Sequence, residues 1–353
     1  MRSKNIITMP VYGIGDMLMA TPALRNIKER TGSRIVCLHM FGSTRDVLTG
    51  NSNVDENHLF PFLSRPKIEG MKFLLKFRAR GFDASINFYP SNRRDYNLSA
   101  MLVGAPVRIG HRYALRDLGE LNFLKNRTVR EDDALHNVQE NLRLLGFLGI
   151  DDPEPYPLGI YLSEEERAWA TGWMDWRGFG GLVLFGFHPG SSLFKEHAKK
   201  RWPKEKYATL IRELSGAVPD SAFLLFGGPE EDALKEEIIS MAAIDAGRVI
   251  AVSTASIRQS AALMERCRVF VTNDSGLMHL AAALQVPTVA LFGPTNPAWL
   301  SPWRTPSRVL RMPGCPPCFR YSPIPQRCNR GEDFACLAAM DVKTVLGAAM
   351  ELL

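Results

Sequence analysis

Apolar runs rich in β-branched residues alternate along this chain with longer amphipathic segments, which is the pattern of an α/β protein. In the first half the pattern predicts strands at residues 6–11, 34–39 and 84–88 and helices at residues 16–30 and 135–148. In the second half it predicts strands at residues 182–185, 223–226, 249–252, 269–271 and 288–292 and a terminal helix at residues 342–353. We therefore expect doubly wound parallel sheets covered by helices.

The two series of elements are separated at residues 151–157, where three prolines within five residues cannot continue a helix. A chain of 353 residues is also too long for one ordinary core. We predict a first Rossmann-like domain at residues 1–160, a second at residues 161–338, and a terminal helix within residues 339–353.

The strand predicted at residues 269–271 passes abruptly into an Ala- and Leu-rich helix, with Asp274, Ser275 and Gly276 at the junction. The first N–H groups of a helix lack intrahelical partners and lie at the positive end of its dipole, so this junction suits a diphosphate. His279 lies one turn inside the helix, on the face that carries Ser275. The alternative is that Asp274 only caps the helix.

Two further segments follow predicted strands. The first is Phe187-His188-Pro189-Gly190-Ser191-Ser192, and the second is Gly293-Pro294-Thr295. Ligands of parallel α/β sheets bind outside the carboxyl ends of the strands, so we expect the strand exits to open onto one crevice. The basic segment Lys200-Arg201-Trp202-Pro203 lies just beyond the first exit.

Two more motifs complete the pattern. Gly13-Ile14-Gly15-Asp16-Met17-Leu18 precedes Thr21-Pro22-Ala23-Leu24, and Phe226-Gly227-Gly228-Pro229-Glu230-Glu231 follows a predicted strand of the second half. Together with the Asp274 junction and the segments that begin at Phe187 and Lys200, these two motifs resemble glycosyltransferase family 9, the bacterial ADP-heptose:lipopolysaccharide heptosyltransferases. The resemblance implies a GT-B fold, in which two Rossmann-like domains face each other across a cleft. It further implies that the first domain holds the acceptor, that the second holds the nucleotide sugar, and that the terminal helix packs back on the first domain.

The doublet Gly13 and Gly15 does not indicate a nicotinamide or flavin site, because Leu18 stands where a dinucleotide fingerprint has its third glycine. The resemblance makes Asp16 the catalytic base, which would accept the proton of the acceptor hydroxyl as that oxygen attacks the anomeric carbon. This single displacement would invert the anomeric centre. The alternative role of Asp16 is to cap the helix that follows.

The resemblance also assigns the donor-binding residues. Lys200 matches the lysine that the family uses beside the phosphates, and the alternative is a merely solvated lysine. Arg201 differs from the residue that some family members have at the next position, so it is assigned no role. Glu231 is the expected ribose ligand, since a carboxylate can accept hydrogen bonds from both ribose hydroxyls. Glu230 is an equally spaced candidate for the same ribose contact. The alternative for Glu231 is that it is only an exposed glutamate at a helix start. The remaining donor-binding residues are Ser191, Ser192, Asp274, Ser275, Gly276 and His279.

The chain contains no Asp-x-Asp, the motif with which many glycosyltransferases hold a divalent metal. We therefore expect no cofactor, with fixed cations and helix N–H groups neutralising the leaving diphosphate. Four cysteines nevertheless have a spacing close to that of structural zinc sites, namely Cys315, Cys318, Cys328 and Cys336. Because a cytoplasmic protein disfavours disulfides, zinc and free thiols are the alternatives for them.

The formal net charge of +6 is unevenly placed, with 14 Lys or Arg against 5 Asp or Glu at residues 65–130. Such an excess suits an anionic acceptor or a membrane headgroup layer, with a solvated surface as the alternative. No aromatic ladder or nucleic-acid motif accompanies the charge, so nucleic acid is not expected as a partner. The expected acceptor-binding residues are Arg93, Arg94, Arg108 and Arg112. His136 lies at the start of a predicted helix and is expected to be a helix-end residue, with acceptor contact as the alternative.

The most apolar windows are far shorter than the roughly 20 residues that span a bilayer, and the first residues lack a signal-peptide core. We expect a cytoplasmic protein that can contact the inner face of the membrane. The expected activity is inverting, metal-independent transfer of a heptosyl or related residue from an ADP-sugar to a lipopolysaccharide inner-core or related anionic glycan. The alternatives are a GT-B transferase or epimerase that uses another nucleotide sugar, and a nucleotide-sugar-binding protein without turnover.

Overall fold

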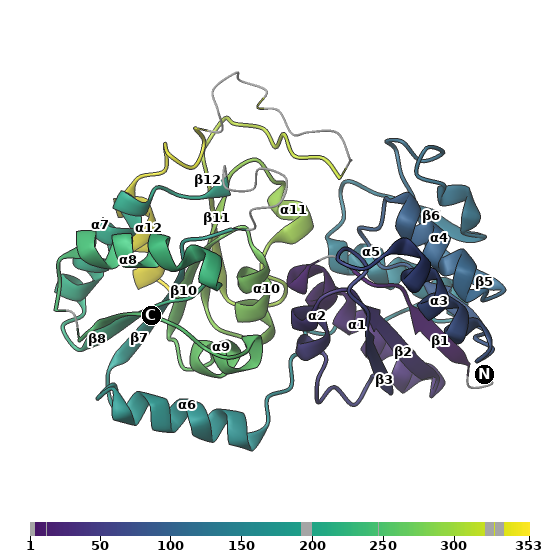
Figure 1. Cartoon of the computed structure of the whole chain (residues 1–353). Coiled ribbons are helices and arrows are strands. Elements are labelled where there is room, and N and C mark those ends of the chain that lie inside the picture. Colours follow the sequence, from purple (N-terminus) through teal and green to yellow (C-terminus); the bar gives the residue numbers. More distant parts are fainter. Residues whose placement is uncertain (1–3, 12, 192–199, 246, 322–327, 329–334) are drawn as a thin grey trace. The chain divides into compact units, whose positions relative to one another are not determined.

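The structure is a computed structural model that describes residues 4–11, 13–191, 200–245, 247–321, 328 and 335–353. These residues fold as two compact units (Figure 1). Unit 1 holds the residues up to Tyr161 together with Tyr321, and unit 2 begins at Leu162 and holds the rest. The division falls one residue from the boundary predicted at residues 160–161. No helix among these residues is both long and apolar enough to cross a membrane.

Unit 1 is built on a parallel sheet with the strand order β3-β2-β1-β4-β5-β6. The strands are β1 Asn5–Thr8, β2 Arg34–His39, β3 Glu56–Leu59, β4 Ala84–Ile86, β5 Val107–Arg112 and β6 Arg127–Arg130. The chain runs outward from β1 to β3 and then crosses to the other side of β1. The order therefore reverses between β1 and β4, the position at which such sheets bind ligands.

Helices cover both faces of this sheet, with α1 packed beside α5 and α3 packed beside α4 (Figure 1). The buried faces of α3 and α4 meet β1 and β2 in a core that includes Ile7, Val36, Leu74, Phe77 and Val103. The helices are α1 Ile14–Thr31, α2 Gly42–Val47, α3 Lys67–Arg78, α4 Arg94–Val103 and α5 Asn137–Arg143, with the 3-10 turns η1 Asn122–Leu124 and η2 Leu144–Leu148.

Unit 2 repeats this topology, with the strand order β12-β11-β10-β7-β8-β9. The strands are β7 Val183–His188, β8 Ser221–Leu225, β9 Val249–Ala251, β10 Val269–Asn273, β11 Thr288–Phe292 and β12 Ser307–Arg311. The helices are α6 Glu164–Trp176, α7 Lys204–Ala217, α8 Asp232–Ala242, α9 Ile257–Met264, α10 Gly276–Ala283, α11 Pro297–Leu300 and α12 Val342–Met350, with the 3-10 turn η4 Pro229–Glu231.

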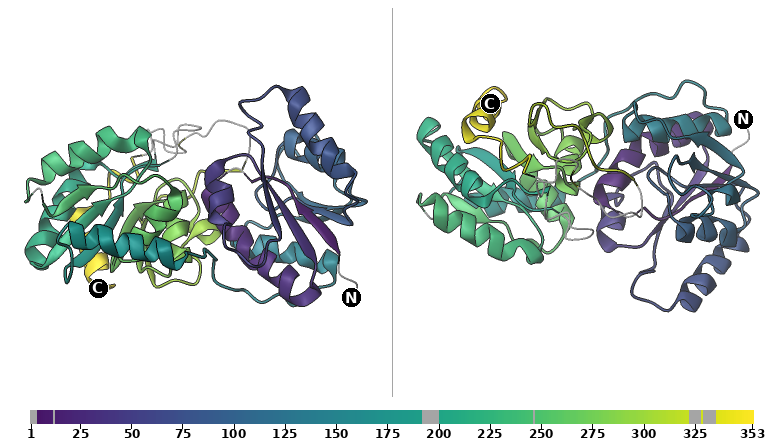
Figure 2. Two further views of the ribbon diagram at one scale, coloured as in Figure 1. Left: turned by 60° about the horizontal axis from the view of Figure 1, so that its bottom comes forward. Right: turned by 90° about the horizontal axis from the view of Figure 1, so that it is seen from above.

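The terminal helix α12 packs within unit 2, against α7 and β11 (Figure 2, yellow). Its buried residues Val345 and Ala349 belong to the core around Trp202. The approach to the helix is fixed as well, because the indole N–H of Trp202 donates to the carbonyl oxygen of Met340 at 3.0 Å. This corrects the expectation that the helix returns to the first domain: its apolar face is buried on the unit that precedes it in the chain.

Candidate functional site

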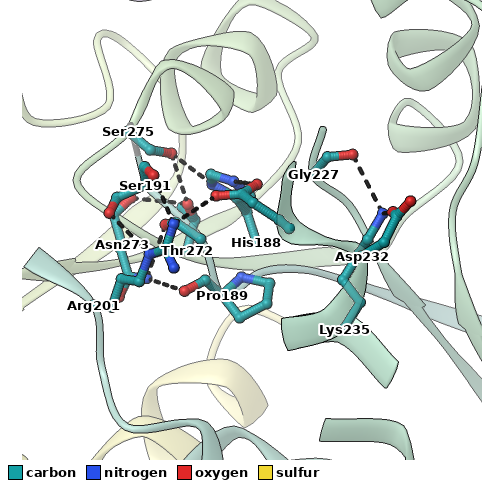
Figure 3. A network of polar contacts seen from close by, with 12 residues as sticks. His188, Pro189, Ser191, Arg201, Gly227, Asp232, Lys235, Thr272, Asn273 and Ser275 are labelled. Atoms are coloured by element: carbon teal, nitrogen blue, oxygen red, sulfur yellow. Dashed lines mark hydrogen bonds and ion pairs between the residues drawn. The ribbon is translucent and has the colours of Figure 1, made fainter. Parts of the chain in front are cut away.

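Strands β7 and β10 are neighbours at the centre of the unit 2 sheet, and their register aligns His188 with Thr272. The strand order reverses between them, since β8 and β9 lie on one side and β11 and β12 on the other. The segments that leave their carboxyl ends, residues 189–191 and 273–276, therefore lie where α/β sheets bind ligands. The structure thus brings together two segments that the sequence singles out (Figure 3).

Helix α10 begins at Gly276, and its N-cap is Ser275 in an extended conformation. The alternative that Asp274 caps this helix is therefore wrong. The side chain of Ser275 makes no capping hydrogen bond, and its Oγ lies 2.8 Å from Nδ1 of His188. The first N–H groups of a helix have no intrahelical carbonyl partner and carry the positive end of the dipole. The start of α10 thus has the geometry of an anion-binding helix terminus.

Asn273 ties together three segments of the site (Figure 3). Its Nδ2 donates to the carbonyl oxygens of Pro189 at 2.8 Å and Gly190 at 3.1 Å, and its Oδ1 accepts from the N–H of Trp202 at 3.0 Å. The side chain is completely buried. An unpaired buried polar group costs about 1–3 kcal/mol, so these three bonds fix the segments relative to one another.

Glu231 is buried at the end of η4. Its Oε2 lies 3.0 Å from Nε2 of His188, and its Oε1 accepts from Nη2 of Arg201 at 3.2 Å. Burial acts to raise the pKa of Glu231, but the hydrogen bond from His188 and the charges of His188 and Arg201 outweigh it and lower the pKa. The carboxylate is therefore ionised and fixed in orientation, whereas the competitor Glu230 is exposed.

His188 links the serine at the helix start to this carboxylate. A carboxylate only accepts hydrogen bonds, so Nε2 of His188 carries a proton toward Glu231, while Nδ1 of the same ring is within hydrogen-bond distance of the Ser275 hydroxyl. Arg201 adds a second link, because its Nε and Nη2 donate to Oγ and the carbonyl oxygen of Ser191 at 3.2 and 2.9 Å. Sequence reasoning gave Arg201 no role and did not select His188.

Lys200 and Asp274 form a buried ion pair, with 3.0 Å between Nζ and Oδ2. The ammonium also lies 4.4 Å from the ring centre of Phe319, a cation–π distance. Burial acts to raise the pKa of Asp274, but the charge of Lys200 outweighs it and lowers the pKa. The alternative of a merely solvated Lys200 is therefore wrong, since its charge is held directly beside the start of α10.

His279 is buried inside α10. Burial lowers its pKa to about 4, so the imidazole is neutral at neutral pH. Its Nδ1 has no hydrogen-bond partner among the described residues. Ser192, which the sequence places in the same donor site, lies outside the described residues.

In unit 1, Asp16 follows the carboxyl end of β1 and lies in the first turn of α1. Its Oδ2 accepts from the N–H of Gly13 at 3.1 Å. The N-cap of α1 is thus Gly13, and Asp16 at the third helical position reaches back to its N–H, which stabilises the helix start and orients the carboxylate at the carboxyl edge of the sheet. One carboxylate can both cap a helix and accept a proton, so this geometry is compatible with either role.

The four arginines expected at the acceptor site divide between the two ends of the sheet. Arg93 and Arg94 follow β4, and Arg112 ends β5 and pairs with Asp117. Arg108 instead lies near the amino end of β5, four residues from Arg112, or about 13 Å along the strand. Its guanidinium donates to the carbonyl oxygens of residues 105 and 124. Arg108 therefore has a structural role and does not belong to one patch with the other three.

Two further expectations concern His136 and the cysteines. His136 is the N-cap of α5, and its Nδ1 accepts from the N–H of Val138 at 3.1 Å, which confirms its place at a helix end. Cys315, Cys318, Cys328 and Cys336 form no disulfide within the part of the chain that the structure describes. Among the described residues, no group of three or more His, Cys, Asp or Glu is placed to hold a metal ion.

Solved structures with the same fold cover nearly the whole chain. The glycosyl transferase family 9 protein from Veillonella parvula has a TM-score of 0.80 at 24% identity, covering 99% of this chain and 97% of the other. The ADP-heptose lipopolysaccharide heptosyltransferase II of E. coli has a TM-score of 0.75 at 24% identity, covering 99% and 98%. The fold is therefore GT-B, as expected from the sequence.

The sequence itself matches a known family. The chain is 29% identical over 314 residues to lipopolysaccharide heptosyltransferase 2 of Salmonella typhimurium, with 85% of each chain covered. The family model of glycosyltransferase family 9 (heptosyltransferase) matches residues 73–326, more than half of the chain. The protein therefore belongs to glycosyltransferase family 9 and is a transferase enzyme.

Proposed function

We propose that this enzyme transfers a heptosyl or related residue from an ADP-sugar to a lipopolysaccharide inner-core or related anionic glycan, with inversion and without a metal. The observation that supports this most is the group of side chains at the ends of β7 and β10. There the start of α10, the Lys200–Asp274 pair and Glu231 lie together on one edge of the sheet. The names of the relatives suggest the sugar and the class of acceptor.

On the donor side, the diphosphate would lie against the first turn of α10. Lys200 has three N–H donors and gives one to Asp274, so it can offer others to a phosphate oxygen. Ser191, Ser192 and Ser275 would add hydroxyl donors. Glu231 accepts hydrogen bonds from His188, from Arg201 and from the backbone of Ser191. A carboxylate has about four lone-pair sites, so it can still accept from a ribose hydroxyl.

On the acceptor side, Asp16 would act as the general base. As the acceptor oxygen forms its bond to the anomeric carbon, the bond from that carbon to the diphosphate oxygen breaks. The acceptor proton moves to the carboxylate of Asp16, which the N–H of Gly13 holds in place. The electron pair of the broken bond stays on the diphosphate, where Lys200 and the helix start stabilise the added charge.

The test is a transfer assay with ADP-heptose and lipopolysaccharide that lacks its inner-core heptose. We expect ADP release matched by a mass gain of one heptosyl unit, and inverted anomeric configuration by NMR. EDTA and added magnesium should leave the rate unchanged, and a rate that depends on the divalent ion would refute the metal-free scheme. Turnover with another nucleotide sugar but not with ADP-heptose would refute the assigned donor.

A further inference from the structure

Helix α3 carries apolar side chains on its solvent face. Ile68, Met71 and Leu75 are 56%, 43% and 44% exposed. With about 100° between successive residues, these three lie within one narrow stripe of the helix. The opposite face is buried on the sheet through Leu74 and Phe77. The exposed stripe is therefore additional to the face that holds α3 in the fold.

Basic residues border this stripe on both sides. By the same helical geometry, Lys67 and Arg78 lie along one border and Lys72 and Lys76 along the other. All four are exposed, and none forms an ion pair with a described residue. Their charges are thus available to an anionic partner.

The neighbouring helix α4 extends the apolar surface. Leu98 and Met101, three residues apart on α4, are 40% and 52% exposed. Helices α3 and α4 pack against each other on one side of the unit 1 sheet (Figures 1 and 2). We call these five apolar residues and the four bordering basic residues the α3–α4 surface.

We propose that the α3–α4 surface docks on an anionic lipid bilayer. An apolar stripe between two rows of basic residues is the pattern of a helix that lies in the membrane interface, because the stripe enters the acyl boundary while the charged ends of the lysine and arginine side chains remain among the phosphates. Anionic headgroups attract each such lysine or arginine. A second copy of the chain suits this surface less well, since residues 65–80 hold six Lys or Arg and one Glu and would repel themselves.

This inference goes beyond the proposed transfer reaction and does not depend on it, because neither Asp16 nor the donor site belongs to the α3–α4 surface. Docking would hold unit 1 at a bilayer, which is where a lipid-linked acceptor resides.

The experiment measures binding of the full chain to vesicles of phosphatidylglycerol and phosphatidylcholine in equal parts, by flotation, with pure phosphatidylcholine vesicles beside them. We expect binding to the anionic vesicles that weakens as salt is added. Lys72→Glu should lower the affinity about five-fold or more, because one basic contact is lost and a repulsive one is added. Met71→Ser should lower it several-fold through loss of apolar burial.

Matched controls are Lys343→Glu and Met350→Ser, both exposed positions on α12 in unit 2. The controls should bind as the unaltered protein does, and all four variants should transfer to a water-soluble acceptor at the same rate. Equal binding to neutral and anionic vesicles, or equal effects of surface and control variants, would overturn the proposal. So would a self-association that Met71→Ser abolishes while no vesicle binding occurs. Failure of the transfer assay would bear only on the proposed function.

Discussion

The carboxylate of Glu231 occupies the space that a side chain at Gly190 would need. A Cβ atom placed on Gly190 would lie 1.7 Å from Oε1 of Glu231, far inside any possible contact. The same carboxylate closes the space beside Gly227, where a Cβ would lie 2.5 Å from Oε2. The glycines of two strand-exit segments are therefore explained by the close approach of one buried carboxylate.

Gly190→Ala should weaken ADP binding about ten-fold, because the added methyl group forces Glu231 out of its hydrogen bonds to His188 and Arg201. The dissociation constant can be measured by calorimetry. Gly216→Ala in α7 is the matched control, since no atom apart from the nearby backbone of its own helix and its chain neighbours lies within 4 Å of the added Cβ. Equal ADP affinities of the two variants would show that Glu231 does not contact the nucleotide.

Asp16→Asn should abolish turnover and leave ADP affinity unchanged. The amide oxygen of asparagine can still accept from the N–H of Gly13, so the start of α1 is preserved, but the amide cannot take up the acceptor proton. Loss of a general base costs about 10²- to 10⁴-fold in rate. The rate at saturating substrate and the melting temperature should be measured together. A folded variant with near wild-type rate would leave helix capping as the role of Asp16.

Lys200→Met should lower the unfolding free energy of unit 2 by about 3 kcal/mol or more, because it leaves Asp274 charged and buried without its partner. It should also weaken ADP binding and slow turnover. The double variant with Asp274→Asn removes the stranded charge and should regain most of the stability. ADP binding should stay weak in the double variant, since the phosphate still lacks its cation. Recovery of ADP affinity along with stability would mean that Lys200 only holds the fold.

Arg94→Ala and Arg108→Ala should have different effects, although both remove one charge from the same basic segment. Arg94 is exposed at the start of α4 after β4, so its loss should raise the acceptor KM in a salt-dependent way with kcat unchanged. Arg108→Ala should instead lower the unfolding free energy by about 1–2 kcal/mol, because two backbone carbonyls lose their donor. If Arg108→Ala raised the acceptor KM and Arg94→Ala lowered the unfolding free energy instead, the placement of the acceptor at the carboxyl edge of the unit 1 sheet would be contradicted.

The sequence predicts the central strands well because they are short apolar runs. The strands predicted at residues 34–39 and 288–292 have the observed bounds of β2 and β11. Strands β3, β5, β6 and β12 escape prediction because polar and charged residues interrupt their apolar pattern, as in the sequences Val-Arg-Ile-Gly-His-Arg of β5 and Arg-Thr-Val-Arg of β6. The helix predicted at residues 135–148 begins at Asn137 and changes after Arg143 to the 3-10 turn η2.

The candidate site is also predictable only in part, because local sequence pattern indicates some of its segments while tertiary contacts determine how the side chains are placed. Strand exits rich in Gly, Ser and Asp are visible in the sequence, and they do meet at the ends of β7 and β10. The direction of a side chain is set by tertiary contacts, so Arg201 cannot be recognised as the partner of Glu231 from its position beside Lys200. Charge counting likewise cannot tell that Arg108 and Arg112 lie at opposite ends of β5.

Lys125 in unit 1 makes the stability of that unit depend on pH above neutrality. Its ammonium is buried, donates to Oδ1 of Asn122 at 2.6 Å, and lies 5.3 Å from the ring centre of Tyr113. Burial lowers its pKa to about 7 in the folded protein, against about 10.4 for an unfolded lysine. Between these values the unfolded chain binds the extra proton, so raising the pH stabilises the folded state.

Lys125→Met should therefore flatten the rise in unfolding free energy between about pH 7 and pH 10, because it removes the group whose pKa differs between the two states. Far-UV circular dichroism during chemical denaturation is the suitable measurement, since all six tryptophans lie between residues 169 and 303 and their fluorescence reports on unit 2. Lys72→Met, at an exposed position, should keep the wild-type slope. If the unfolding free energy of Lys125→Met rose with pH as steeply as that of the wild type, Lys125 would stay protonated in the folded protein. The Asn122 contact and the Tyr113 ring would then compensate for its burial.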